Sequence, residues 1–289
     1  MKKILIILGT TIIVVCSLFI IKYNFISKIN KLSNLSILSA SQRNENEIEY
    51  NYNKLSSPDF EERYKAVYFF SKLKKDKFNN KIMKLTFDLF EKELNKRKEA
   101  MDLIRKLGNA NKLPQEMVYL NSEQYGMYSV YLCEILGKSN DISLLPFLVE
   151  HCLIPEVLIN FGDSAVKPVM NIVQTTSNPI KKMSAISVLS EMLKHKKEGY
   201  IVKGELRRKI KEVLIKATKD PDRYIKSMAV NALGDSEDKD IIPILEKIEE
   251  NDPYSFKEKD ITSGTIKIRY PVREEAKKTL EELKAKEIE

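Results

Sequence analysis

One pattern recurs along most of this chain and constrains its fold more than any other feature. A basic residue is followed three positions later by a small residue, and apolar residues come three, four and seven positions after that. Positions with these spacings share one face of an α-helix, so each copy predicts a helix with one buried stripe. The clearest copies are Arg63, Ala66, Phe69, Phe70 and Leu73; Arg97, Ala100, Leu103, Ile104 and Leu107; and Lys182, Ala185, Val188, Leu189 and Met192.

Three weaker copies extend the pattern along the chain. They are Ser129, Leu132, Cys133 and Leu136, without the basic residue; Lys226, Ala229, Ala232 and Leu233; and Arg273, Ala276, Leu280 and Leu283. The small residues of successive copies lie between 29 and 56 positions apart. In known repeat proteins built from pairs of helices, one unit is about 40–47 residues long. The intervals therefore indicate a row of helix pairs, some of them shortened, and the longest interval has room for an extra degenerate unit.

A second pattern marks the expected second helix of a pair. It consists of Asp, four residues, Pro and then an apolar face, at Asp141 and Pro146, Asp163 and Pro168, and Asp238 and Pro243. An Asp side chain can cap the free amides of a helix start, and Pro is tolerated in a first turn because its missing N–H would have no partner there. We therefore expect the prolines at helix starts or turns, and none inside a helix.

One segment carries the pattern most fully and resembles the HEAT-like repeat family, including the short bacterial kind first noticed in phycobilin lyases. It comprises Asp220, Pro221, Asp222, Arg223, Tyr224, Ile225 and Lys226, followed by Ala229, Ala232, Leu233, Gly234 and Asp235. Residues 270–276 are the next closest match. The resemblance covers roughly residues 57–285 and implies an all-α fold, an α-solenoid of about six helix pairs. HEAT-like proteins include scaffolds, adaptors, lyases, hydroxylases and DNA glycosylase relatives, so the resemblance implies architecture rather than activity.

Residues 254–270 interrupt the helical pattern. Ile266, Ile268 and Tyr270 alternate with polar residues, which is typical of a half-exposed strand, and Ser263 with Gly264 can turn the chain. We therefore expect a small β-hairpin between the last helices. It either contacts a partner or caps the end of the array.

The start of the chain predicts a membrane segment. Residues 4–21 carry no charge and are flanked by basic residues on both sides, and 18 apolar residues cross most of a bilayer as a helix. No small residues follow soon enough to favour a cleaved signal, although cleavage stays open. We expect an anchor over 1–22, a polar linker over 23–56 and the helical array over 57–289.

The orientation in the membrane follows less directly. Lys2 and Lys3 lie on one side of the apolar run, and Lys22, Lys28 and Lys31 on the other, so the balance of basic residues is close to a tie. A short basic start before an apolar run is similar to an export signal. We therefore expect a single-pass protein with its C-terminal domain outside the cytoplasm, and a cytoplasmic domain is the alternative.

Charge identifies one candidate binding surface. The net charge is +8, but half of it lies in residues 1–56, so the rest of the chain is nearly balanced. Residues 203–226 hold nine basic and four acidic side chains. The apolar stripe of this segment leaves four basic residues on the solvent side. A solvated helix face is the favoured interpretation, and the alternative is a basic groove that binds an acidic peptide, an anionic lipid or envelope polymer, or nucleic acid. The residues of this candidate surface are Lys203, Arg207, Arg208 and Lys211.

The sequence offers no catalytic, metal or cofactor site. It has only two histidines, His151 and His195, and no pair of groups is singled out for acid–base work. Cys133 and Cys152 could meet across a helical hairpin, but we expect them to be separate buried thiols. The sequence therefore predicts a non-catalytic scaffold that binds a protein or peptide on its curved surface and leaves the oligomeric state open. The alternatives are a basic-groove binder of nucleic acid or anionic polymer, and a lyase-like enzyme with an unidentified site.

Overall fold

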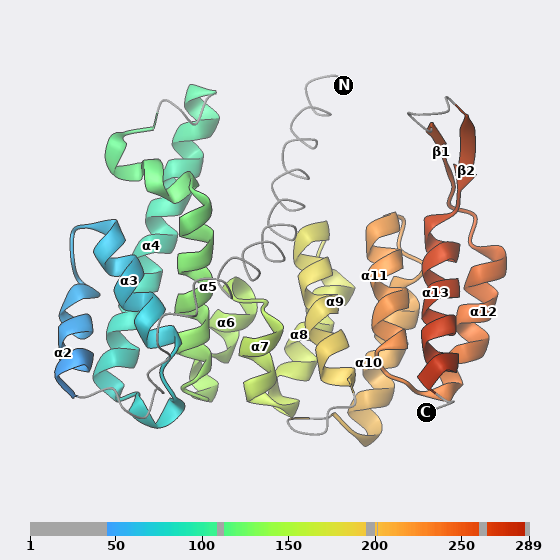
Figure 1. Cartoon of the computed structure of the whole chain (residues 1–289), viewed down its shortest axis with the longest axis horizontal. Helices are drawn as coiled ribbons and strands as arrows, with labels where there is room; N and C mark the ends of the chain where they lie inside the picture. The colour runs from blue at the N-terminus through green and yellow to red at the C-terminus, as the bar shows by residue number, and fades with distance from the viewer. Residues whose placement is uncertain (1–44, 109–112, 195–199, 201, 260–264, 287–289) are drawn as a thin grey trace. The chain divides into compact units, whose positions relative to one another are not determined.

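The computed structural model describes residues 45–108, 113–194, 200, 202–259 and 265–286 (Figure 1). Within them the chain is mostly helical, with twelve α-helices, several short 3-10 turns and one two-stranded antiparallel sheet. The chain divides into two compact units, residues 1–50 and residues 51–289. The second unit contains nearly all of the described residues.

The helices follow one another with short connections. The first six are α2 (Glu45–Lys54), α3 (Phe60–Ser71), α4 (Asn80–Leu107), α5 (Glu123–Gly137), α6 (Leu145–His151) and α7 (Pro155–Leu158). The next six are α8 (Asp163–Thr175), α9 (Pro179–Leu193), α10 (Gly204–Ala217), α11 (Arg223–Gly234), α12 (Ile242–Asn251) and α13 (Pro271–Lys286). Strands β1 (Phe256–Lys259) and β2 (Ile266–Arg269) lie between α12 and α13.

The extensive contacts between described helices join near neighbours in the sequence. Every such pair is adjacent in the chain or separated by a single helix. Helices α3, α5, α7, α9, α11 and α13 form a series in which each contacts the next, and α6, α8 and α10 form a second such series. Contacts between α5 and α6, α8 and α9, and α10 and α11 join the two series, while α4 contacts α5 and α12 contacts α13.

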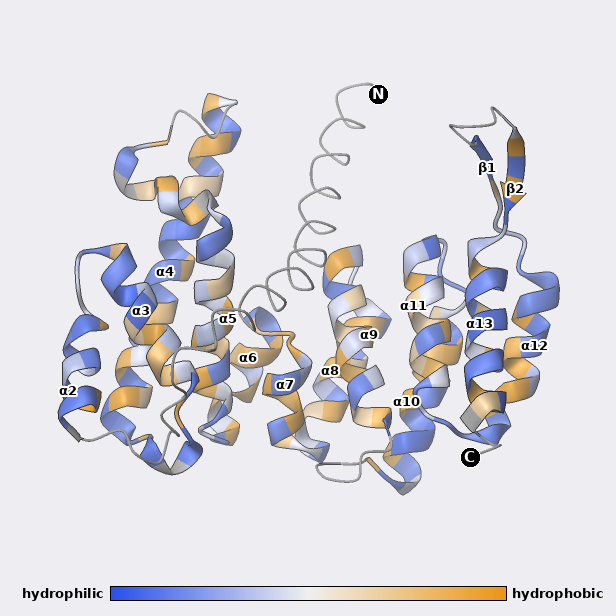
Figure 2. Cartoon of the chain, viewed as in Figure 1, coloured by the Kyte–Doolittle hydropathy of each residue, from blue (hydrophilic) through white to orange (hydrophobic). Residues whose placement is uncertain are grey.

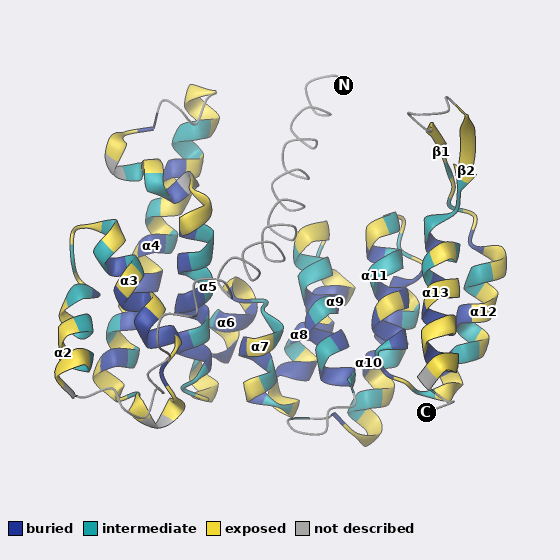
Figure 3. Cartoon of the chain, viewed as in Figure 1, coloured by how far each residue is buried: buried dark blue, intermediate teal, exposed yellow. Residues whose placement is uncertain are grey.

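The small residues of the repeated pattern lie where these helices meet. Ala66, Ala185, Ala229 and Ala276 are fully buried and Ala100 is 2% exposed, as Figure 3 shows for the helices that carry them. This confirms the buried stripe in every copy except the one at Arg97, where Leu103 and Ile104 are half-buried and Leu107 is 40% exposed. Contact is closest between α11 and α13, where a Cβ added to Gly234 would lie 2.2 Å from a methyl group of Thr279.

Two expectations about individual helices are wrong. The copy of the pattern at Arg97 does not begin a helix, because it forms the second half of the 28-residue α4. Asn79 caps the start of α4, Gly108 ends it with a left-handed φ of 70°, and no Gly or Pro lies between them. Likewise, Pro168 lies inside α8. That helix begins at Asp163 itself, whereas the other two Asp–Pro copies place Pro in the first turn of α6 and α12.

The two cysteines of the folded part form a disulfide rather than separate thiols. Cys133 in α5 and Cys152, the residue after α6, have Cα atoms 5.7 Å apart. This separation is typical of disulfides. The connection between α5 and α6 turns the chain back on itself, which brings together two residues that are 19 apart in the sequence. The expectation of free thiols is therefore corrected.

The predicted hairpin is present. Strands β1 and β2 pair antiparallel, with Phe256 opposite Arg269, Lys257 opposite Ile268, Glu258 opposite Lys267 and Lys259 opposite Ile266. In Figure 1 the two strands project beyond the ends of α12 and α13, the helices that they connect.

The predicted membrane localisation is corrected by the described helices. None of them combines the length and the apolar character that crossing a membrane requires, because each carries charged or polar residues on its exposed face; even α4, the longest, does so. The expected single-pass localisation is corrected on this finding. The apolar run at 4–21 itself lies outside the described residues.

Candidate partner-binding surface

Two of the four predicted basic residues are held by carboxylates from another part of the chain. The Nε atom of Arg207 lies 3.0 Å from Asp238, and its Nη1 donates to the carbonyl oxygen of Leu193 at 2.8 Å. The Nζ atom of Lys211 lies 3.0 Å from Asp238 and 2.6 Å from Asp240. Both cations therefore link α10 to the segment that precedes α12.

The titration of Asp238 reflects this arrangement. Burial alone would raise the pKa of its carboxyl, but hydrogen bonds from Arg207 and Lys211 outweigh burial and lower the pKa below its ordinary value. Burial would lower the pKa of Lys211, but hydrogen bonds to Asp240 and Asp238 raise it. Asp238 and Lys211 therefore stay charged together near neutral pH, and the positive charge of the two cations is largely balanced within the fold.

The other two predicted residues are exposed. Arg208 forms ion pairs with Glu205 and Glu212 on the same helix, at 2.6 and 2.5 Å. Lys203, just before α10, is exposed, and its side chain has no partner among the described residues. The fold thus leaves Lys203 alone as an uncompensated cation of the predicted surface. Binding at these four residues stays a prediction.

A different arginine has no carboxylate partner in the described part of the chain. Arg223 begins α11, and its guanidinium carbon lies 4.5 Å from the ring centre of Tyr224, 5.0 Å from Phe256 and 5.6 Å from Tyr254. Its Nη2 donates to the Tyr224 hydroxyl at 2.6 Å. We call these four residues the Arg223 cluster. Tyr224 is 47% exposed, so solvent reaches the cluster.

Local capping positions both halves of the cluster. The Asp222 carboxylate accepts the backbone N–H of Tyr224 at 2.7 Å and thereby fixes the start of α11. The Asp252 carboxylate accepts the backbone N–H of Tyr254 at 3.0 Å and an ion pair from Lys226 of α11 at 2.8 Å. Asp252 therefore ties the segment that leads into β1 to the helix that carries Arg223.

The composition of the cluster is typical of a protein-recognition site. A guanidinium presents a planar fork of N–H donors that matches a carboxylate, and aromatic rings on its flanks hold it in place. Arginine and tyrosine are enriched among the residues that contribute most to protein–protein binding. The hydrogen bond to Tyr224 raises the pKa of Arg223, although burial opposes this, so its positive charge is permanent. The cluster can bind an acidic group of a partner.

Sequence reasoning missed this cluster. Arg223 and Tyr224 belong to the best copy of the repeat pattern and were interpreted only as part of it. Tyr254 and Phe256 follow about thirty residues later, and nothing in the sequence shows that α12 returns them to the start of α11. The available signal was the high density of aromatic residues beside the predicted hairpin, at positions 254, 256 and 270.

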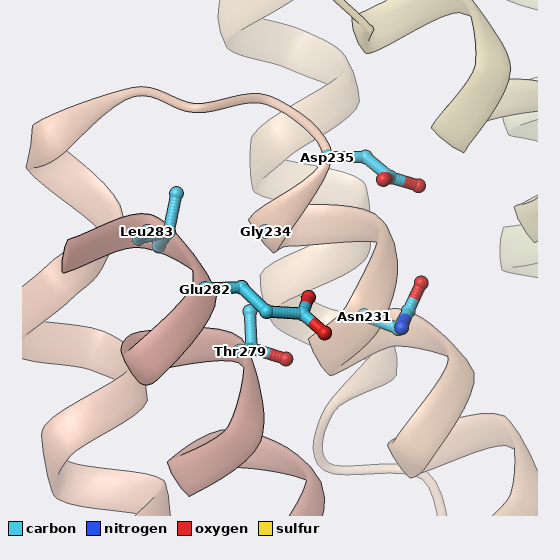
Figure 4. Close-up of a pocket in the computed structure, with 6 residues that line it drawn as sticks. All are labelled: Asn231, Gly234, Asp235, Thr279, Glu282 and Leu283. Atoms are coloured by element: carbon cyan, nitrogen blue, oxygen red, sulfur yellow. The ribbon is translucent and has the colours of Figure 1, made fainter. Parts of the chain in front are cut away.

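A small pocket between α11 and α13 offers no room for a substrate. About 30 Å³ of it can be occupied by the centres of water molecules, which is room for a few of them. Figure 4 shows its lining, which is Asn231, Gly234, Asp235, Thr279, Glu282 and Leu283. The pocket is too small for a cofactor or a metabolite. In the described ranges, no group of three or more His, Cys, Asp or Glu side chains is placed to hold a metal ion.

Comparison with known proteins adds no assignment. No protein-family model matches the chain, and no curated protein matches it. The resemblance to HEAT-like repeats therefore stays a prediction from the sequence.

Proposed function

We propose that residues 51–289 form a HEAT-type helical-repeat scaffold that binds a protein or peptide partner and has no catalytic role of its own. Helix pairs α3/α4, α5/α6, α7/α8, α9/α10 and α11/α12 are its units, and α13 is the final helix. The repeat pattern predicts about six pairs; the copy at Arg97 belongs to α4, and no second helix follows α13 in the described residues.

The pattern of contacts between successive helices supports the repeat architecture. In a solenoid each repeat touches only its neighbours, and equivalent helices of successive repeats lie side by side. The series α3, α5, α7, α9, α11 and α13 has this property. Short α7 takes the place of a first helix within the longest interval of the sequence pattern, which makes it the degenerate unit. A repeat array offers an extended surface, which suits a protein or peptide.

The Arg223 cluster is the single observation that favours partner binding. An arginine held by three aromatic rings, with no carboxylate partner among the described residues, has unused N–H donors in a fixed orientation. The predicted basic-groove alternative has less support, because Asp238 and Asp240 already balance Arg207 and Lys211. No observation favours the lyase-like alternative.

Site-specific photo-crosslinking in the native cell tests the proposal. A benzoylphenylalanine at Tyr224 is expected to trap one discrete partner, and adding Arg223→Ala to that chain is expected to reduce the adduct several-fold. The matched control carries the same photoreactive group at Val118, which is 53% exposed and lies far from the cluster in the sequence. The absence of an adduct at position 224, or an adduct of equal yield at both positions, would reject the cluster as a binding site.

A further inference from the structure

The β1–β2 hairpin has two faces of different character. Side chains alternate along a strand, so the observed register places Phe256, Glu258, Lys267 and Arg269 on one face and Lys257, Lys259, Ile266 and Ile268 on the other. The first face is attached to the rest of the fold. Arg269 donates from Nη1 to Glu258 across the hairpin at 2.8 Å and from Nε to Glu274 of α13, also at 2.8 Å.

The second face, which we call the Ile–Lys face, has no described contact. Ile266 is 65% exposed and Ile268 is 57% exposed, the highest values among large apolar residues of the second unit. Lys257 and Lys259 are also exposed, and neither forms an ion pair with a described residue. Figure 2 shows the apolar bands on β2, and Figure 3 colours this part of the hairpin as exposed.

The hairpin is held in place although this face is bare. A two-stranded hairpin alone is at best marginally stable in water. Here Arg269 bridges Glu258 and Glu274, and Arg223 lies against Phe256 at the start of β1. The hairpin is thus oriented through one face, while two β-branched apolar side chains point away from the fold. Ordered, exposed apolar side chains with charged neighbours are typical of a protein-interaction site.

Charge decides which partner fits the face. Lys257 lies directly opposite Ile268 and Lys259 directly opposite Ile266, so each apolar side chain has a cation beside it. A second copy laid face to face would bring four lysines into one interface with no carboxylate among the described side chains of either face, and such like charges oppose the contact. A partner that carries carboxylates next to apolar side chains would cover the isoleucines and neutralise the lysines together.

From this arrangement we infer that the Ile–Lys face binds an acidic segment of another protein, in which Asp or Glu residues alternate with aliphatic ones. The inference deepens the proposed scaffold function by naming the chemistry of the partner. The Ile–Lys face is a different surface from the Arg223 cluster, because Phe256 of that cluster lies on the opposite face of the hairpin.

Selection of random twelve-residue peptides displayed on phage, with the full-length chain as bait, tests the inference. We expect enrichment of peptides that combine Asp or Glu with Val, Ile or Leu. For a selected peptide, fluorescence anisotropy should show that Lys257→Glu/Lys259→Glu raises Kd roughly tenfold, because two attractive pairs become repulsive. Ile266→Thr/Ile268→Thr should weaken binding to a similar degree.

A matched control and a reciprocal selection make the result specific. The control Lys277→Glu/Lys284→Glu makes the same change of charge at exposed positions of α13 and should leave Kd unchanged. Selection against the Lys257→Glu/Lys259→Glu chain should enrich basic peptides instead. The inference is overturned if the same acidic peptides bind both chains equally, if no peptide is enriched, or if light scattering shows a dimer that Ile266→Thr/Ile268→Thr dissociates.

The Arg223→Ala chain separates this inference from the proposed function. If selected peptides lose affinity for Arg223→Ala and bind the hairpin variants normally, the scaffold function stands and the Ile–Lys face is not the site. If peptides depend on the hairpin and the crosslink at position 224 fails, the hairpin is the site and the Arg223 cluster is not.

Discussion

The same position of the repeated pattern is used differently at the two ends of the second unit. In α3, Arg63 is buried, and its Nη2 lies 3.3 Å from Glu93 of α4, with 7% and 2% of the two side chains exposed. In α9 and α11, Lys182 and Lys226 reach forward to Asp220 and Asp252, each of which lies just after the following helix, at 2.9 and 2.8 Å. The basic residue is thus almost fully buried with its partner at one end, and at the other it forms a slightly more exposed ion pair, in which 13–18% of the lysine side chain is exposed.

Aromatic side chains account for the buried version. The Tyr119 hydroxyl donates to Glu93 Oε2 at 2.9 Å, and the Tyr125 hydroxyl donates to the Glu93 carbonyl oxygen at 3.2 Å. Burial, and then the charge of Glu93, raise the pKa of Tyr125 to about 12, so this donor stays protonated at physiological pH. The same basic position of the pattern can therefore form a buried, hydrogen-bonded ion pair or a more exposed one. Which of the two forms depends on the side chains that the neighbouring helices place beside it.

Breaking the buried pair should have the largest effect. Glu93→Ala removes the counter-charge of Arg63 and leaves a buried guanidinium, which costs about 3–5 kcal/mol of the free energy of unfolding. Urea denaturation followed by circular dichroism measures this loss. Arg63→Met/Glu93→Leu, which removes both charges, should recover most of the stability. A loss below about 1 kcal/mol for Glu93→Ala would mean that the pair is not buried.

Removing the disulfide between Cys133 and Cys152 should cause the second-largest loss in the free energy of unfolding. The disulfide closes a loop across 19 positions, so Cys133→Ala/Cys152→Ala should lower the free energy of unfolding by about 3 kcal/mol, mainly because the unfolded chain gains freedom. Thiol labelling of the denatured wild-type chain provides the control. Three reactive thiols before any reductant is added, rather than that of Cys16 alone, would show that the disulfide does not form.

Breaking one of the lysine–aspartate ion pairs should lower the free energy of unfolding less than breaking the Arg63–Glu93 pair. Lys226→Met removes the ion pair to Asp252, whose carboxylate keeps its hydrogen bond from the Tyr254 amide. We expect a loss of about 2 kcal/mol, the size of a hydrogen bond to a charged group. Thermal melts at matched pH measure it, with Lys182→Met as the equivalent change one repeat earlier. A loss equal to that of Glu93→Ala would remove the distinction between the two ends.

The smallest loss in the free energy of unfolding is expected for an exposed ion pair on α13. Lys278 and Glu282 of α13 lie one turn apart at 3.7 Å, with 62% and 57% of their side chains exposed. Lys278→Ala should change the free energy of unfolding by about 0.5 kcal/mol or less. Denaturation at low and high salt checks this value. A larger, salt-sensitive change would show that ion pairs on the surface of α13 contribute more than their exposure implies.

Local features of the fold could be predicted from the sequence, while contacts between distant segments could not. The burial of Ala66, Ala185, Ala229 and Ala276 follows from helical spacing, and the hairpin follows from the alternation around Ile266 and Ile268. These features depend on residues within one turn or one strand of each other.

The predictions that were wrong or incomplete concern residues whose contacts come from distant parts of the sequence. The disulfide between Cys133 and Cys152 depends on how tightly α6 folds back, and the neutralisation of Arg207 and Lys211 depends on Asp238, more than 25 positions away. The Arg223 cluster was missed for the same reason. One repeat pattern fixes the helices but does not determine which side chains of successive repeats meet.

We propose that residues 51–289 form an array of helix pairs in which each pair is stabilised mainly by contacts with the adjacent pairs. Native-state hydrogen exchange of Glu93→Ala tests it most directly, because this variant perturbs one end strongly. The account predicts that amides of α3, α4 and α5 lose protection by 100-fold or more, while those of α11 and α13 change by less than about tenfold. An equal loss of protection in all of these helices would show a single cooperative core and would contradict the account.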